Sequence, residues 1–397
     1  MAIVFTTEIS TTQVLSSFNN SVVSFSSDIV KTAVSCDILI DNGVTPLTFT
    51  ITPISDVFEF NFKEIVKTLL TQNQFDERLI PAYLEWYQNG IENADSFDVD
   101  YTITFDDLTT DSDSLTYVFD RSVRQIYSTA NKPFPIVAPL VWNNKELTIF
   151  KGYPTDLYLY LAGNFSLYNE TTNKNKTFTA ASEQGKLWLS KGEFELSINE
   201  EEEEFIARFS GAGSFIYTNP CSDLEANEDP FFRIGVNNMF VSDSISGENT
   251  RLTITQKDVC EGVFVRWIND EGSWSYWLFG KVHTDSINGS STGTVDNDFY
   301  NLNDTQDSYY APTLSLGTAG VNTLNLNYQG LSESEHEQIK SVVTSPRVEL
   351  YNKGYGELVE RDSFQTVIRA NGSITKNTKR GTSNISISLL KNKYTQR

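Results

Sequence analysis

The residues that could carry catalytic or metal chemistry are few in this chain of 397 amino acids, and they are scattered. There are two histidines, His283 and His336. A Ser-His-Asp or Cys-His mechanism would need one of them as its base, and neither stands near a nucleophile motif. Two histidines are also too few for a histidine-rich metal site. We therefore assign no catalytic, cofactor-binding or metal-ligating residue, and we expect no enzyme.

Acidic residues leave two alternatives open. Paired carboxylates could hydrolyse glycosides, because their separation in space cannot be read from a sequence. Close-spaced aspartates could hold calcium, but they lack the glycine and terminal glutamate of an EF-hand loop, so we interpret them as solvated turns. We interpret the run of glutamates in "INEEEEEF" as a solvated loop, with a negative channel rim as its alternative. The close-spaced aspartates are Asp95, Asp98, Asp100, Asp111, Asp113, Asp296 and Asp298, and the glutamate run is Glu200–Glu204.

The stretch "RWINDEGSWSYWLFG", residues 266–280, contains three of the six tryptophans. It is typical of a β-hairpin around an Asn-Asp-Glu-Gly turn. Alternation puts Val265 and Trp267 on one face and Phe264 and Arg266 on the other, and aromatic residues of the second strand again fall on both faces. A sugar-binding platform would need its aromatics on one exposed face. We therefore predict a core or interface element, anchored by Trp267, Trp274, Tyr276 and Trp277.

The net charge of -22 and the pI near 4.5 argue against direct nucleic-acid binding, which depends on clustered Lys and Arg. The charge is uneven: Ser341–Arg397 contains ten basic and four acidic residues, or +6, which leaves about -28 on the first 340. Head-to-tail association between copies is therefore electrostatically favourable. The simpler alternative is a solvated basic end.

Cys36, Cys221 and Cys260 are an odd number without the spacing of a zinc or redox motif, which favours a reducing compartment. The start "MAIVFTTEISTTQVL" has no basic and apolar signal regions, and no stretch approaches the length of an apolar membrane span. We expect synthesis in the cytosol and no membrane insertion.

Strand patterns dominate the chain. Period-two alternation recurs in "PLTFTITPI", "DVDYTITF", "GEFELSI" and "SNISISLL", and turn sequences such as "DNG" favour hairpins over crossover helices. Apolar spacing predicts a short helix near 61–72, and Pro81 and Gly90 suit a second near 81–89. A third, near 333–344, has the Ser332 and Glu335 spacing of a capping box and ends before Pro346.

These patterns predict a mainly β protein of two β-sandwich-like domains with a few short α-helices. Polar turn residues and two prolines interrupt the strands in "YTNPCSDLEANEDPFF", so we place the domain boundary near residue 225. The N-terminal domain, 1–225, would hold the first two helices. The C-terminal domain, 226–397, would hold the tryptophan hairpin and the third helix.

Three stretches resemble a layout found in structural tail proteins of tailed bacteriophages, particularly those that infect Bacteroidetes-type hosts. They are "VCEGVFVRWINDEGSWSYWLFG", "VVTSPRVELYNKGYGELVERDSF" and "SITKNTKRGTSNISISLL", and "TIFKGYPTDLYLYLAG" is similar to the N-terminal half of those proteins. The resemblance is to distal tail and baseplate proteins, and it transfers no catalytic residue.

The resemblance implies a non-enzymatic virion protein of the tail tip, baseplate or an adaptor ring, made in the host cytoplasm. It would form a homo-oligomer, with a ring expected, and contact other tail proteins, without a cofactor. The alternative is a carbohydrate-binding adhesin that contacts the host envelope through exposed aromatic residues, so a host glycan stays an open partner.

Overall fold

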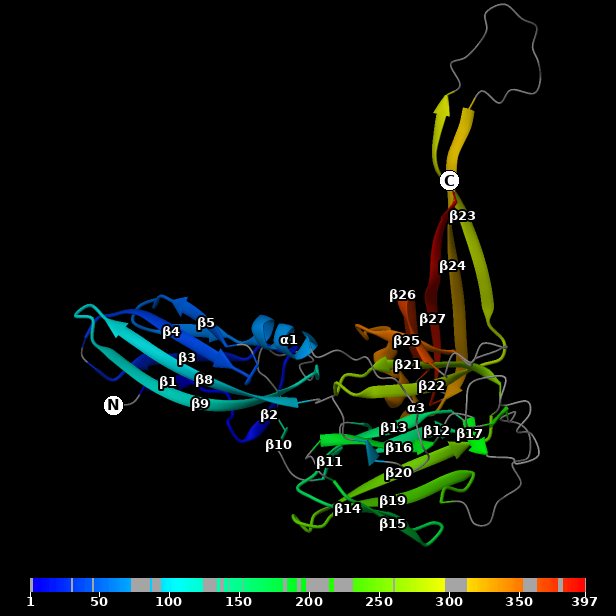
Figure 1. Cartoon of the computed structure of the whole chain (residues 1–397), viewed down its shortest axis with the longest axis horizontal. Coiled ribbons are helices and arrows are strands. Elements are labelled where there is room, and N and C mark those ends of the chain that lie inside the picture. The colour runs from blue at the N-terminus through cyan, green and yellow to red at the C-terminus, as the bar shows by residue number, and fades with distance from the viewer. Residues whose placement is uncertain are drawn as a thin grey trace, which may run out of the picture. The chain divides into compact units, whose positions relative to one another are not determined.

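The computed structural model describes residues 3–29, 31–44, 46–72, 86–87, 94–123, 134–135, 139–141, 143–151, 153–180, 184–190, 194–197, 214–217, 231–259, 261–296, 313–352, 363–377 and 381–396. Most of them lie in strands (Figure 1), which confirms the predicted mainly β fold class with few short helices. The chain divides into two compact units. Unit 1 comprises Met1–Cys260 and Ile268–Ser275, and unit 2 comprises Glu261–Trp267 and Tyr276–Arg397.

The N-terminal part of unit 1 is a sandwich of two sheets around one apolar core. The smaller sheet has the order β1 (Ile3–Thr7), β3 (Val22–Ser27) and β6 (Phe58–Asn61). The larger has the order β10 (Phe134–Pro135), β2 (Gln13–Ser16), β9 (Thr110–Asp120), β8 (Ala94–Phe105), β4 (Ala33–Asp41) and β5 (Leu47–Ile51). In β8 every second side chain is buried, from Phe97 to Phe105, as the alternation predicts.

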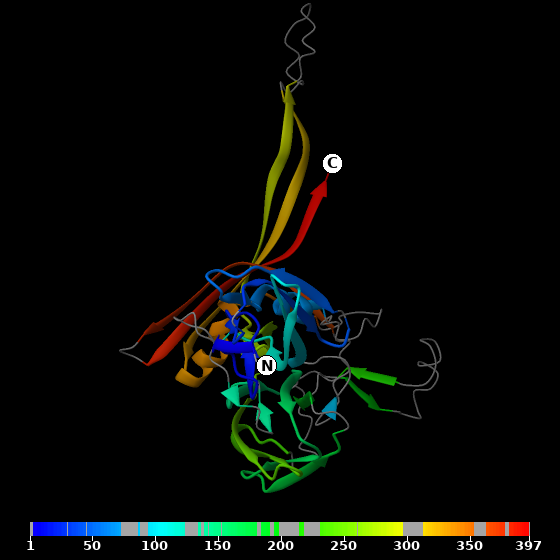
Figure 2. The ribbon, with the colours of Figure 1, turned by 90° about the vertical axis from the view of Figure 1, so that its left-hand side faces the viewer.

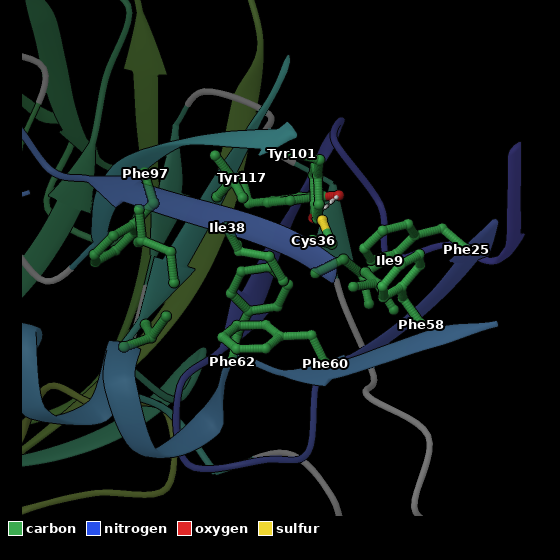
Figure 3. Packing of buried hydrophobic residues seen from close by; sticks show 14 of the residues in the cluster. Ile9, Phe25, Cys36, Ile38, Phe58, Phe60, Phe62, Phe97, Tyr101 and Tyr117 are labelled. Carbon is green, nitrogen blue, oxygen red and sulfur yellow. Dashed lines mark hydrogen bonds between the residues drawn. The ribbon is translucent and has the colours of Figure 1, made fainter. Parts of the chain in front are cut away.

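Aromatic rings fill this core (Figure 3). Phe25 stacks on Phe58 with 5.4 Å between ring centroids, and Tyr101 meets Phe25 edge-on at 5.0 Å. The Tyr101 and Tyr117 hydroxyls lie 3.2 Å apart beside the thiol of Cys36 (Figure 3). Burial raises the pKa of Cys36 and of Tyr117 to about 12, and it also raises the pKa of Tyr101.

The helix α1 (Lys63–Gln72) lies where the apolar spacing predicts it. Val66, Leu69 and Leu70 of its stripe are buried in the same core. Its C-terminal end leaves carbonyl groups without partners inside the helix, and the buried Arg121 donates Nε and Nη2 to the Leu70 carbonyl at 3.2 and 2.9 Å. One arginine thereby joins the helix end to the end of β9.

A second sandwich in unit 1 has its own apolar core. One sheet has the order β11 (Leu140–Val141), β13 (Thr155–Tyr160), β16 (Gln184–Ser190) and β7 (Trp86–Tyr87). The other has the order β12 (Glu146–Phe150), β20 (Asn249–Lys257), β19 (Gly235–Asp243), β14 (Phe165–Asn169) and β15 (Lys174–Phe178). A separate pair joins β17 (Phe194–Ser197) to β18 (Ser214–Tyr217).

Hairpins do not account for all of the pairing. β12 pairs with β20 in parallel, and β2 pairs with β9 in parallel. Each of these pairs joins strands about a hundred residues apart, so local turn chemistry could not have predicted them. The expected hairpins are present where consecutive strands pair, as in β4 with β5, β8 with β9 and β14 with β15. Other antiparallel pairs, such as β4 with β8 and β24 with β27, join strands that are not consecutive.

Unit 2 contains one seven-stranded sheet. Its order is β22 (Trp274–Gly280), β21 (Gly262–Ile268), β25 (Val348–Asn352), β26 (Ser363–Asn377), β27 (Thr382–Gln396), β24 (Thr313–Leu331) and β23 (Thr284–Asp296). The helix α3 (Glu333–Ile339) continues into the 3₁₀ helix η2 (Lys340–Val343). The predicted capping box is present: the Ser332 hydroxyl accepts from the Glu335 N–H at 3.3 Å, and the Glu335 carboxylate accepts from the Ser332 N–H at 2.8 Å.

Two predictions fall largely outside the described residues. Of the helix expected near 81–89, only Trp86–Tyr87 are described, and they form strand β7 against β16 instead of a helical turn. The boundary predicted near residue 225 lies in 218–230, outside the described part of the chain.

Candidate functional site

The turn of the tryptophan hairpin is organised by one side chain, Asn269. Its backbone N–H donates to the Ser273 carbonyl at 2.8 Å, and its Oδ1 accepts from the N–H groups of Glu271 and Ser273, both at 3.0 Å. Its Nδ2 donates to the hydroxyls of Ser273 and Ser275 at 2.9 and 3.0 Å. Gly272 has a φ of +82°, which a residue with a Cβ adopts only with strain. The predicted Asn-Asp-Glu-Gly turn is therefore fixed by its own residues.

One face of the hairpin packs against α3, η2 and β24 within unit 2. Trp267 and Trp277 are both 0% exposed. The Trp267 Nε1 donates to the Ser341 hydroxyl of η2 at 2.9 Å. The Trp277 ring meets Tyr328 of β24 edge-on, with centroids 5.3 Å apart. The indoles are thus held by packing and by a hydrogen bond whose acceptor comes from 74 residues away.

The opposite face carries a row of aromatic rings across four strands of the unit 2 sheet. Tyr276 stacks on Phe264 at 5.9 Å, Phe264 meets Tyr351 edge-on at 5.8 Å, and Tyr351 lies 5.1 Å from Phe364. The row follows β22, β21, β25 and β26 in order. Aromatic residues on both hairpin faces were predicted to mean burial, and the exposures of 2% for Phe264 and Tyr276 confirm it.

A buried ion pair lies beside this aromatic row. Arg266 and Glu349 are directly opposite in the β21 and β25 pairing, and the Arg266 Nε lies 2.7 Å from Glu349 Oε2. Glu349 Oε1 accepts from Arg347 Nε at 2.6 Å and from the Thr366 hydroxyl at 3.2 Å. The Arg266 guanidinium also stacks on Phe364, 3.9 Å from the ring centroid. Both carboxylate oxygens of Glu349 therefore accept hydrogen bonds, and the two arginines make these bonds charge-assisted.

Trp274 belongs to unit 1, whereas Trp267 and Trp277 belong to unit 2. Its carbonyl accepts from the Nδ2 of Asn143 at 2.9 Å, and the Oδ1 of Asn143 accepts from the Tyr158 N–H at 2.8 Å. Nothing in the sequence around Asn143 indicates this contact, which spans 131 residues. The hairpin therefore supplies its tip to one unit and its base to the other.

Neither of the two histidines takes part in the hydrogen bonds described above. His283 is exposed, and its Nδ1 lies 2.9 Å from the Lys281 carbonyl oxygen. His336 is half-buried on α3, and that burial lowers its pKa. Across the described residues, no group of three or more His, Cys, Asp or Glu side chains could hold a metal ion.

The described acidic residues among those singled out in the sequence lie along strands, and one of them, Asp111, is buried, where its Oδ2 accepts from the Ser27 hydroxyl at 3.2 Å. Asp95, Asp98 and Asp100 lie on β8, and Asp111 and Asp113 lie on its neighbour β9. Asp98 accepts from the Thr116 hydroxyl at 2.6 Å across that pair of strands. They are strand residues, not the turns that were predicted. Asp296 ends β23, while Asp298, Glu200–Glu204, Cys221 and Cys260 lie outside the described residues.

No family model and no curated protein matches this chain. A structure concerned with the host cell surface retention of a 1.5-MDa bacterial ice-binding adhesin aligns at 8% identity, over 80% of this chain and 87% of the adhesin chain, with a TM-score of 0.16. A Ca2+-stabilized adhesin with which an Antarctic bacterium binds ice aligns at 10% identity, over 92% of this chain and 74% of the other, with a TM-score of 0.15.

In the part of the chain that the structure describes, no helix has the length and apolar character needed to cross a membrane.

Proposed function

We propose that this chain is a non-enzymatic structural component of a phage tail, a tail-tip, baseplate or adaptor-ring protein that links other tail parts. The proposal rests on the resemblance to tail proteins and on one observation in particular, the burial of the tryptophan hairpin. Trp267, Trp274 and Trp277 are at most 3% exposed. The densest aromatic stretch of the chain is therefore used for packing.

The chemistry around the hairpin supports an architectural role. Several of its polar groups have defined partners: Asn269 bonds the turn, Trp267 bonds Ser341 of η2, and Arg266 pairs with Glu349 of β25. Buried polar groups of this kind define one geometry rather than a place where a ligand enters. A protein that transmits position between neighbours needs such defined geometry.

The proposed partners are further copies of this chain in a ring and adjacent tail proteins. The net charge of -22 suits a protein beside which DNA passes without binding. Synthesis in the host cytoplasm and release with the virion complete the proposal.

The test is to locate the protein in particles. Purified virions of the phage that encodes this chain are digested for peptide mapping, and antibody-labelled particles are imaged. We expect peptides from the whole chain at a constant stoichiometry, with label at the tail end. A chain absent from washed particles would contradict the proposal.

The carbohydrate-binding alternative makes a different prediction in a glycan array. Buried indoles cannot stack on a sugar ring, so binding that depended on the hairpin aromatics would require them to be exposed. Tight sugar binding by the isolated chain, lost on substitution of an exposed aromatic residue, would favour the adhesin. We expect no such binding.

A further inference from the structure

Three strands of unit 2 run together beyond α3 and β25 (Figures 1 and 2). We call the following segments the arm: Ile287–Ser291 of β23, Thr318–Asn322 of β24 and Asn392–Gln396 of β27. Each level of the arm joins three residues, from Ile287, Asn322 and Asn392 at one end to Ser291, Thr318 and Gln396 at the other. β23 and β27 are each antiparallel to β24, so they run in the same direction along its two sides.

Both sides of the arm are open edges within the described residues. β23 ends the strand order and pairs with β24 alone. β26 accompanies β27 only as far as Leu390, so Asn392–Gln396 pair with β24 alone. Such edges present a row of backbone N–H and C=O groups to any other strand.

Within the arm, the β23 edge has no basic residue, proline or bulge, the features that normally prevent strand addition; the irregular register of β23 begins after Ser291. Its thirteen residues include no Lys, Arg or Pro. Ile287, at the beginning of the arm, is 65% exposed, and Asn288 and Gly289 beside it are also exposed. An exposed isoleucine on a long unprotected edge is a liability unless another strand covers it.

The two edges carry opposite charge. β23 contains Asp285 and Asp296 and no basic residue, whereas Lys391 and Lys393 lie in the last part of β27, which has no acidic residue. Just before the arm begins, Lys391 Nζ of β27 lies 3.0 Å from Asp285 Oδ2 of β23 in the same chain, across the intervening strand. A β23 edge therefore suits a β27 edge better than it suits another β23 edge.

Symmetry decides which edges can meet. Copies related by a rotation axis along the arms point their arms in the same direction, which brings β23 of one beside β27 of the next, in parallel and at the same level. Copies related by a two-fold axis across the arms would instead pair β23 with β23, antiparallel. The first arrangement uses both open edges and joins opposite charges.

We propose that the β23 edge of the arm binds the Asn392–Gln396 segment of a second copy of this chain, so that neighbouring arms form one continuous sheet. This inference deepens the proposed function, on which it rests for the expectation that the chain forms a ring. The arms would then close the ring by backbone hydrogen bonds between unlike edges.

Disulfide trapping tests the pairing directly. Asn288→Cys and Lys393→Cys variants are prepared separately, mixed in equal amounts and oxidised, and linked peptides are mapped by mass spectrometry. Within one chain these positions are two strand spacings apart, about 9 to 10 Å, too far for a disulfide. A second pair, Ser290→Cys with Lys393→Cys, covers a register shift of two residues. We expect the 288–393 or 290–393 link in the mixture and in neither variant alone.

Each other result contradicts the inference. A 288–288 or 290–290 link in a single variant would show antiparallel β23 pairing, and the absence of any arm link in assembled protein would show that rings form elsewhere. In both cases the chain still self-associates, so the proposed function stands while the arm contact fails. Failure of the proposed function is seen separately, as absence from virions.

A charge variant provides a second readout. Ile287→Lys places a lysine on the β23 edge, and it should weaken self-association by about tenfold in sedimentation or light scattering. Val282→Lys is the matched control, because Val282 is 88% exposed and lies just before β23. Equal association of the two variants would overturn the proposal.

Discussion

At the scale of single residues, the buried ion pair between Arg266 and Glu349 should contribute strongly to the stability of unit 2. Both side chains are at most 3% exposed, and Glu349 is also bonded by Arg347. Removing one partner of a buried pair leaves an uncompensated charge, so Glu349→Ala should destabilise unit 2 by about 3 to 5 kcal/mol. The measurement is urea unfolding followed by tryptophan fluorescence.

The exposed pair between Lys281 and Glu261 is the control for this measurement. Its atoms approach to 2.5 Å, yet the side chains are 76% and 59% exposed. Because water and salt screen such a pair, Lys281→Ala should change stability by less than about 1 kcal/mol. Similar losses for the two variants would show that burial does not set the strength of these pairs.

A second residue-scale prediction concerns alkaline pH in the N-terminal sandwich. The pKa of the Cys36 thiol lies at about 12, above its ordinary value of 9.0, because burial disfavours the thiolate. Burial likewise raises the pKa of Tyr101 and the pKa of Tyr117. Unfolding therefore releases protons at high pH, so the stabilising contribution is complete below pH 9 and is lost as the pH rises toward 12.

Urea unfolding at several pH values measures this loss. The double variant Tyr101→Phe/Tyr117→Phe removes two of the three ionisable groups but keeps their rings, so its stability should fall less steeply above pH 9. A pH slope identical to that of the unmodified chain would contradict the assignment.

At the scale of elements, the hairpin turn requires glycine at position 272. Gly272 has a φ of +82°, and a Cβ there would lie 2.6 Å from the Arg121 carbonyl carbon, which belongs to the backbone and cannot swing away. Gly247 has a φ of +70° with nothing within 4 Å of a Cβ. Gly247→Ala should therefore cost about 1 kcal/mol from backbone strain alone. Gly272→Ala should cost roughly 1 to 3 kcal/mol more, from overlap.

Thermal unfolding of the two glycine variants measures this difference. Both glycines lie in unit 1, and each variant is compared with the unmodified chain. If both variants lost the same free energy of unfolding, the backbone at Arg121 would have to shift to accommodate the Cβ at position 272.

The capping box of α3 is a second element on which the hairpin depends. Ser332→Ala removes the acceptor for the Glu335 N–H and should cost about 1 kcal/mol, whereas Ser332→Asp should retain most of the stability. Because α3 and η2 carry Gln338 and Ser341, which bond to the hairpin, tryptophan fluorescence should report the loss. If the fluorescence transitions of both variants were unchanged, the stability of the hairpin would not depend on the capping box of α3.

Element prediction from the sequence succeeded where the signal was local. The Ser332 and Glu335 spacing, the apolar stripe of α1 and the two-sided aromatic pattern of the hairpin all depend on residues a few positions apart. The arm was missed for the same reason: "TDSINGSSTGTVD" has little apolar alternation, and its strand character comes from pairing with β24. Trp86–Tyr87 likewise form a strand because β16 lies beside them.

At the scale of the whole molecule, what the sequence could not supply is the long-range pairing. Glu146 is level with Thr253 in a parallel pair, and Asn143 bonds the hairpin from 131 residues away. Such contacts are set by how complete sheets pack, and many pairings satisfy the same local pattern. The hairpin's burial could be predicted from its two aromatic faces, but the residues that bury it could not.

The uneven charge of the chain leads to a prediction about assembly. Residues 341–397 carry +6, and the first 340 carry about -28, so association between copies joins a basic segment to an acidic surface while the copies repel one another overall. Moderate salt screens both effects, with a Debye length near 8 Å at physiological ionic strength. If unlike segments meet, as in the proposed ring, the attraction acts at short range and should dominate at low salt. We therefore expect the oligomer to dissociate as salt is raised from about 0.05 M to about 0.5 M in light scattering.

A double variant that reverses Lys376 and Lys393 to Glu should associate more weakly at low salt and lose this dependence. Assembly that strengthens steadily with salt would instead indicate that apolar contacts hold the copies together and that the charge split serves only solubility.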